Sequence, residues 1–392
     1  MKKNLYKIFA VAVAAIMLFS MSGCAGDAVT ITKTSTVTQT KTVIVTADIT
    51  TTTSKEPTTT VASDPVKPTT RTVVDMDGNE VEVPYPITSY FNAYPVSNGV
   101  MVLLGVQEAQ MYYLERMTGK NWGWLREFNP LINERTIIGT DANATAEEVL
   151  NTDAQVVIIS NKATAETYRE AGITVFSVSA GNTIDGFRKS IKKTAELFGE
   201  EAMAKAEAYV AYSEELQAMV EERIAAVPKD QYPSVYYISG GATPYNTSKG
   251  GNYAEEYIAI GGGYLCTAGG VITGNTITAE QLLEIDPDYI FSGTNNRNPA
   301  YDALMADEAL AGLSAIKNGK VYKTPQGTLP WDTLGPEIAM MPVFVGKTLH
   351  PELFEDIDLK ELMTDFYKKF YNYDLSDEYA DLMLAGVMGP QA

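Results

Sequence analysis

The chain has very few of the side chains that form disulfides or bind soft metal ions. It contains one histidine and two cysteines, Cys24 and Cys266, among its 392 residues. So few cysteines exclude a disulfide framework, and the fold must depend on its hydrophobic core. The histidine, His350 in KTLHPELF, precedes a proline on a segment that we expect to be exposed, and we assign it a structural role. A bare metal ion is therefore disfavoured, although direct binding of ferric iron by tyrosine and carboxylate stays open.

Basic side chains and catalytic motifs are scarce as well. Lysine and arginine number 30 against 49 acids, a net charge of −19, which argues against binding to nucleic acid or to anionic lipid. The sequence has no GxSxG, P-loop, HExxH or clustered-cysteine motif. The glycine-rich GGGYLCTAGG lacks the setting of a dinucleotide site, and its glycines are predicted to let a helix end pack closely. We expect neither an enzyme nor a cofactor.

The N-terminus carries an export signal. Lys2, Lys3 and Lys7 precede the apolar run FAVAVAAIMLF, which is far shorter than the ~20 residues that cross a bilayer. Residues 1–23 are therefore predicted to be a signal peptide. MSGC at 21–24 resembles the lipobox of bacterial lipoproteins, and this resemblance implies a lipid on Cys24 and a place on the outer face of the cell membrane. A plain secretory signal with a chance cysteine is the alternative.

Residues 24–70 are dominated by threonine, serine and valine with scattered proline. Few large apolar groups are present to offset chain entropy, so this segment is predicted to be a disordered tether, with O-glycosylation left open. About 40 flexible residues span roughly 35 Å. The tether would let a membrane-anchored body move over the surface.

Strand-like apolar runs alternate with amphipathic segments from Arg71 onward, after a hairpin signal in TVVDMDGNEVEVP. This alternation is typical of an α/β fold with largely parallel sheets, and it occurs twice. We expect an N-terminal lobe at 71–199, a C-terminal lobe at 229–392, and a helix at 200–228 of roughly 40 Å between them. Such a helix would join the lobes rigidly; an ordinary long surface helix is the alternative.

One short segment occurs twice: TAEEVLNTDAQVVIIS at 145–160 and TAEQLLEIDPDYIFSG at 278–293. Each copy starts with a capping box, in which Thr145 pairs with Glu148 and Thr278 with Gln281. The second helical residues, Glu147 and Glu280, are left to point outward. Each lobe therefore presents one exposed glutamate at a helix start.

The repeat, the hairpin VVDMDGNEVEVP, the long helix and the late WDTLGPEIA resemble the iron-siderophore, haem and vitamin B12 family of ABC-importer substrate-binding proteins. The likeness covers roughly 71–384. It implies that Glu147 and Glu280 dock onto arginines of two permease subunits; the proline usual in this motif is Ala154 in the first copy. The alternative role of these glutamates is favourable placement at a helix start, worth ~0.3–1 kcal/mol.

The resemblance also implies a ligand cleft between the lobes, formed by loops that follow the strands. These loops are rich in aromatic rings, which suit a flat or aromatic ligand, and two cations there could pair with anionic oxygens. For each ring, core packing is the alternative. The candidate ligand-binding residues are Tyr90, Phe91, Tyr94, Trp122, Trp124, Tyr245, Lys249, Arg297 and Trp331, of which Trp331 best matches a family pocket position.

We therefore expect an α/β protein with two three-layer lobes of mostly parallel sheets, joined by one long rigid helix, with the ligand between them. The expected function is that of a lipid-anchored receptor. It would capture an iron chelate (a siderophore or haem) or a corrinoid and deliver it to an ABC permease dimer with its ATPase. The alternative is a surface lipoprotein that captures haem, or adheres to polymers, without a permease.

Overall fold

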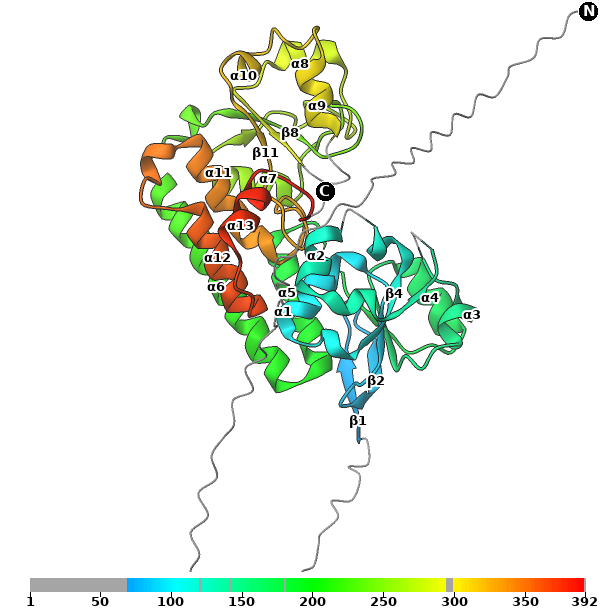
Figure 1. Cartoon of the computed structure of the whole chain (residues 1–392). Helices are drawn as coiled ribbons and strands as arrows, with labels where there is room; N and C mark the ends of the chain where they lie inside the picture. The colour runs from blue at the N-terminus through cyan, green and yellow to red at the C-terminus, as the bar shows by residue number, and fades with distance from the viewer. Residues whose placement is uncertain (1–68, 120–121, 141–142, 180, 294–298, 391–392) are drawn as a thin grey trace, which may run out of the picture. The chain divides into compact units, whose positions relative to one another are not determined.

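The computed structural model describes residues 69–119, 122–140, 143–179, 181–293 and 299–390 (Figure 1). The expected signal peptide, the lipidation site Cys24 and nearly all of the tether lie outside the described residues. Among the residues described, no helix is both long and apolar enough to cross a membrane.

The predicted hairpin opens the fold. Strands β1 (Thr69–Val74) and β2 (Glu80–Tyr85) pair in antiparallel register from Thr69 opposite Tyr85. The first strand begins two residues before the expected start at Arg71. Its turn contains Gly78, whose φ of 86° is in the left-handed region that glycine adopts without strain.

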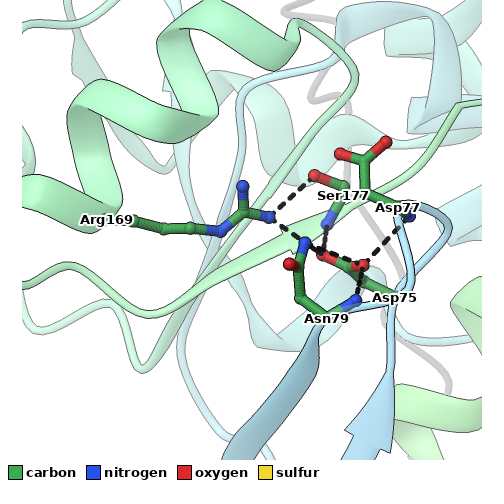
Figure 2. Close-up of polar contacts among 5 residues, drawn as sticks. All are labelled: Asp75, Asp77, Asn79, Arg169 and Ser177. Carbon is green, nitrogen blue, oxygen red and sulfur yellow. Dashed lines mark hydrogen bonds and ion pairs between the residues drawn. The ribbon is translucent and has the colours of Figure 1, made fainter.

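The carboxylate of Asp75, at the end of β1, ties this turn to the rest of the fold (Figure 2). Its Oδ1 accepts hydrogen bonds from the backbone N–H groups of Asp77 and Asn79, at 3.0 and 2.8 Å. Its Oδ2 pairs with the guanidinium of Arg169 at 2.9 Å and accepts from the backbone N–H of Ser177 at 3.3 Å. One buried acid therefore joins the hairpin to a helix and a strand far along the chain.

The first sheet has five parallel strands in the order β5-β4-β3-β6-β7. Every residue of β3, β6 and β7 is buried, as expected for parallel strands covered on both faces. The strands are β3 (Tyr90–Asn92), β4 (Gln110–Leu114), β5 (Thr136–Ile138), β6 (Val156–Ile159) and β7 (Val175–Ser177). The helices in this part are α1 (Asn98–Leu104), α2 (Gly123–Phe128), α3 (Ala146–Leu150), α4 (Lys162–Glu170) and α5 (Ile184–Phe198).

The second sheet has four parallel strands in the order β11-β10-β8-β9. Its strands are β8 (Ser234–Ile238), β9 (Tyr264–Leu265), β10 (Tyr289–Ser292) and β11 (Val321–Lys323). The helices here are α7 (Tyr253–Ile260), α8 (Ala279–Ile285), α9 (Pro299–Ala306) and α10 (Ser314–Lys317). Two sheets with interspersed helices confirm the expected fold class.

A long helix, α6 (Glu200–Ile224), lies between the two sheets in the sequence (Figure 1). Its 25 residues make it about 37 Å long. One hydrophobic core contains α6 together with residues from both halves, from Val100 on α1 to Val235 on β8. By contacts the described chain is a single unit, so the exact lobe boundaries given above stay a prediction.

Three helices after the second sheet complete this shared core: α11 (Met341–Leu349), α12 (Leu359–Tyr371) and α13 (Asp377–Leu384). The Tyr209 hydroxyl of α6 donates to the carbonyl of Pro336 at 2.9 Å, and the Tyr371 hydroxyl of α12 donates to the carbonyl of Gly99 at 3.3 Å. The C-terminal helices therefore brace both halves of the chain.

The glycine-rich segment behaves as expected, whereas the histidine does not. A side chain on Gly261 would collide with Val345 of α11, and one on Gly263 would collide with Leu349. These glycines let the end of α7 pack closely against α11. The expectation that His350 is exposed is wrong: it is 7% exposed, and its Nε2 lies 2.9 Å from the carbonyl oxygen of Gly262.

Replacing Asp75 with alanine should lower the free energy of unfolding by roughly 3 kcal/mol, because it leaves Arg169 and several N–H groups without their acceptor. Asp75→Asn, which keeps the size but removes the charge, should have a smaller effect. The matched control is Lys189→Ala, which breaks an exposed surface pair with Asp185 and should cost under ~0.5 kcal/mol. Urea unfolding followed by circular dichroism measures all three; equal losses for Asp75→Ala and the control would contradict the prediction.

Candidate functional site

The most polar buried place in the second half of the chain lies where three parallel strands end. The carboxylate of Asp332, 1% exposed, accepts hydrogen bonds from the Tyr237 hydroxyl of β8 at 2.6 Å and from the Thr324 hydroxyl, just after β11, at 3.1 Å. A side chain on Gly293, just after β10, would collide with the same carboxylate. Asp332 therefore lies across the carboxyl ends of three strands, the edge at which open α/β sheets bind their ligands.

Phenol groups surround this carboxylate. Tyr253 and Tyr257, one turn apart on α7, and Tyr237 all have raised pKa values, first because burial disfavours the phenolate and then because Asp332 is negatively charged. For Tyr253 the pKa is raised to about 12. All three phenols are therefore protonated at neutral pH and present O–H groups around one carboxylate. We call Tyr237, Tyr253, Tyr257 and Asp332 the phenol cluster.

One residue of the first half is electrostatically coupled to the phenol cluster. Interaction with Tyr94 is a further cause of the raised pKa of Tyr253, after burial and Asp332. Tyr94 follows β3, and its loop is fixed because the side-chain oxygen of Asn92 accepts from the Tyr94 N–H at 3.1 Å and from the Ser97 hydroxyl at 3.0 Å. Tyr94 is therefore held in a fixed loop at the carboxyl end of β3.

Two buried donors at or next to the phenol cluster have no hydrogen-bond partner among the described residues. They are the hydroxyl of Tyr257 and the indole N–H of Trp331. Both side chains are 0% exposed. A buried donor left without an acceptor costs about 1–3 kcal/mol, so each of these groups calls for an acceptor that the described residues do not provide, such as a buried water molecule or a bound solute. The arrangement offers neutral donors and aromatic surface to a solute with oxygen acceptors.

Comparison with known proteins decides the family. The model of a family described as periplasmic binding protein matches residues 117–328, more than half of the chain. The chain belongs to the periplasmic binding protein family. This confirms the family predicted from the sequence.

Several relatives of this periplasmic binding protein are known. The molybdate-binding protein MolA of Haemophilus influenzae is 25% identical over 189 residues, 48% of this chain and 52% of MolA, so the match spans about half the length of that relative. The solved structure of MolA bound to molybdate has a TM-score of 0.69 at 22% identity and covers 78% of this chain and 99% of its own. A periplasmic solute binding protein from Veillonella parvula has a TM-score of 0.68 at 22% identity, covering 81% and 97%.

A third solved structure, CeuE of Helicobacter pylori with Ni(II) bound, has a TM-score of 0.64 at 19% identity, covering 80% of this chain and 99% of its own. These neighbours share the α/β architecture described above. At such identities they show the fold of the periplasmic binding protein and nothing of its ligand.

Four of the predicted ring residues lie in hydrophobic cores. Tyr90 and Phe91 are 0% exposed; the Tyr90 ring packs 5.2 Å from that of Phe198, and its hydroxyl donates to the Val106 carbonyl at 3.2 Å. Trp122 is 7% exposed. The indole N–H of Trp124 donates to the carbonyl of Val387 at 2.6 Å. Core packing was the alternative for each ring, and solute contact by these four stays a prediction.

The remaining candidates are scattered. The Tyr245 hydroxyl donates to Asp307 at 3.0 Å, and Lys249 is exposed. Arg297 lies outside the described residues. Of the predicted residues, Tyr94 is electrostatically coupled to the phenol cluster, and Trp331 directly precedes Asp332 in the sequence. The described structure does not gather the full predicted set. Sequence reasoning missed Tyr237, Tyr253, Tyr257 and Asp332; the signal for Asp332 was its position next to Trp331 in a loop between prolines.

Both predicted capping boxes are present. The backbone N–H of Glu148 donates to the Thr145 hydroxyl at 3.2 Å, and the Glu148 carboxylate accepts from the Thr145 N–H at 2.7 Å. Thr278 and Gln281 make the same reciprocal pair at 3.2 and 2.9 Å. Glu147 and Glu280 are left exposed, as expected.

The helix start also affects the titration of Glu280. Hydrogen bonds from its own backbone N–H and from the Thr278 hydroxyl hold the pKa of Glu280 below its ordinary value. Neither Glu147 nor Glu280 forms an ion pair within the described ranges. In the same ranges, no group of three or more His, Cys, Asp or Glu side chains is placed to hold a metal ion.

A second buried acid, Glu337, lies next to the site at the start of the shared C-terminal core. Its carboxylate accepts from the backbone N–H and the hydroxyl of Thr328, both at 2.8 Å, and from the Tyr367 hydroxyl at 2.8 Å. Burial nevertheless raises the pKa of Glu337 above its ordinary value of 4.5, because desolvation of the charge outweighs these bonds. Glu337 fixes the loop that precedes Trp331.

Glu337→Gln should make the stability of the protein less dependent on pH. A carboxyl whose pKa is raised in the folded state stabilises fully below its unfolded pKa of about 4.5 and loses that stabilisation as pH rises through the folded pKa. Glutamine keeps the acceptor oxygen and carries no charge. Thermal melts from pH 4 to 8 should show the melting temperature of the variant rising above that of the wild type toward pH 8, with little difference at pH 4. Parallel curves for the two proteins would contradict the assignment.

Proposed function

We propose that this protein captures a solute at the phenol cluster, outside the cytoplasm, and delivers it to an ABC importer. The solute we favour is an iron chelate, such as a siderophore or haem, or a corrinoid. The observation that carries the proposal is the buried carboxylate of Asp332, which lies across the carboxyl ends of three strands of the second sheet with phenol groups around it. A lipid on Cys24 would hold the receptor at the outer face of the membrane.

The chemistry of the cluster supports a solute rich in oxygen acceptors. Tyr257 and Trp331 each hold a buried donor that no described residue uses, and the neighbouring rings provide flat apolar surface. Siderophores, haem and corrinoids present both oxygen acceptors and extended rings or chelate faces. Binding would need no chemical change in the solute.

A second candidate solute is a tetrahedral metal oxyanion. Two observations favour it: the relative MolA is named as a molybdate-binding protein, and neutral buried N–H and O–H donors also suit oxyanion oxygens. The buried carboxylate of Asp332 opposes a small dianion, whose whole charge would lie within the cluster, whereas a large chelate can hold its anionic groups away from it, which is why the chelate comes first.

Titration of the purified protein lacking residues 1–23 tests the proposal. Tryptophan fluorescence, cross-checked by calorimetry, is followed with ferric siderophores, haemin, cobalamin and molybdate, with free ferric iron as the control. Saturable binding of one class below micromolar concentration names the solute. A folded protein that binds none of them would contradict solute capture and favour a surface lipoprotein that adheres to polymers.

Tyr257→Phe should weaken binding of that solute about tenfold while leaving protein stability unchanged or slightly higher. The change removes one hydroxyl that has no described partner, so only a bound solute loses a hydrogen bond. The matched control is Tyr264→Phe, which removes the hydroxyl of a tyrosine that is 52% exposed on β9. Calorimetric Kd values and melting temperatures are compared; an unchanged Kd in Tyr257→Phe would remove the phenol cluster as the binding site.

The double variant Glu147→Ala/Glu280→Ala should abolish uptake of the solute by whole cells and leave its Kd unchanged. The exposed carboxylates have no described ion-pair partners, so their loss leaves the fold intact and removes two contacts to cationic groups of the permease. The control double variant, Glu166→Ala/Glu284→Ala, removes two other exposed acids and the same net charge. Uptake by the first variant at the level of the second would contradict docking through these glutamates.

A further inference from the structure

Two leucines are exposed at equivalent places in the two copies of the repeat. Leu150, the last residue of α3, is 56% exposed, and Leu283, on α8, is 40% exposed. Each is the sixth residue of its copy, TAEEVL and TAEQLL. Isolated exposed leucines are common on protein surfaces. Here an exposed leucine occurs at the same position in both copies of the repeat, which indicates a shared cause.

The hydrophobic cores do not supply that cause. In each copy the preceding residue anchors the helix: Val149 is 4% exposed in the core of the first sheet, and Leu282 is 0% exposed in a core of the second. Neither Leu150 nor Leu283 belongs to, or packs against, a core cluster of the described chain. Their side chains are therefore available to something outside the chain.

Each leucine shares a helix face with an exposed glutamate. Leu150 follows Glu147 by three residues, and Leu283 follows Glu280 by three, a spacing that brings side chains together on one face. The glutamates have no described ion-pair partner, as noted above. Each copy thus presents a carboxylate beside an apolar side chain, which we call the Glu-Leu patch: Glu147 with Leu150, and Glu280 with Leu283.

The topology directs both Glu-Leu patches toward the ligand-binding edges of the sheets. A helix that returns the chain from one parallel strand to the start of the next begins near the carboxyl edge of the sheet. Helix α3 precedes β6 in this way, and α8 precedes β10. Each half of the chain therefore offers one patch, on a helix that starts at the carboxyl edge of its sheet.

We propose that the two Glu-Leu patches are equivalent docking elements for one partner, in which two like subunits each present an apolar pocket next to a basic side chain. The carboxylate contributes charge complementarity, and the leucine contributes apolar area that leaves water on binding. The proposal rests on the proposed function, since the partner is the permease dimer of the importer. It adds the leucines as a second, salt-independent component of docking.

The test measures docking of the purified protein onto the permease–ATPase complex that takes up its solute, held in lipid nanodiscs. Leu150→Gln and Leu283→Gln keep side-chain size and helix propensity but remove the apolar group. Each should weaken the Kd for the complex roughly tenfold, and the pair roughly a hundredfold, because distant sites add. The control pair is Val271→Thr/Met305→Gln, at residues 57% and 48% exposed elsewhere on the surface, and should leave the Kd unchanged.

Salt separates the two components of each patch. Raising ionic strength screens the glutamate contribution, so the loss caused by Glu147→Ala/Glu280→Ala should shrink at 0.5 M salt. The loss caused by the leucine pair should persist unchanged at 0.5 M salt. A leucine effect that disappears with salt, or equal effects of the leucine and control pairs, would overturn the inference.

The outcomes also distinguish this inference from the function on which it rests. If the glutamate variants fail to dock and the leucine variants dock normally, the leucine role is wrong and the importer function is unaffected. A wild-type protein with no measurable affinity for the complex would sink both. A third outcome is that sedimentation shows the wild type to be a dimer and Leu150→Gln/Leu283→Gln to be a monomer. That result would assign the leucines to self-association and overturn their role in docking.

Discussion

The fold depends on one hydrophobic core that both halves of the chain share. Helix α6 lies at its centre, and side chains from α1, β8 and the three C-terminal helices pack into it. Each sheet also has a core of its own, but burial of apolar area is the main stabilising term in folding, so the shared core is what holds the two halves together. Tyr237 and Tyr257 of the proposed solute site belong to this shared core.

Periodicity and capping made most of the elements predictable. The hairpin, the two repeated helix starts and the long helix all follow from local signals, because apolar spacing and Thr-x-x-Glu or Thr-x-x-Gln boxes act within a few residues. The family followed from the order of these segments. The helices after residue 340 were not delimited, since many of their apolar residues pack against partners far away in the sequence, as Phe344 packs against Phe291.

The solute site was much less predictable than the fold. Tyr237, Tyr253 and Tyr257 lie in apolar sequence surroundings that indicate core packing. Only the position of Asp332 across three strand ends indicates that they belong to a polar site. Conversely, Tyr90 lies on β3 and Trp124 lies on α2, and both side chains are buried in hydrophobic cores. Whether a ring faces a cleft or a core depends on the far side of the fold, and sequence periodicity carries no information about that.

The C-terminal tail adds a second attachment between the halves. The chain leaves the first half through α6, and after α13 it returns: Val387 accepts a hydrogen bond from Trp124, and Gly389 lies so close to Gly123 of α2 that neither position has room for a side chain. A second attachment, at a place separated from the first, restrains twisting of one half against the other. Movement of one half against the other in this protein is therefore restrained at two separated places, and its last few residues form one of them.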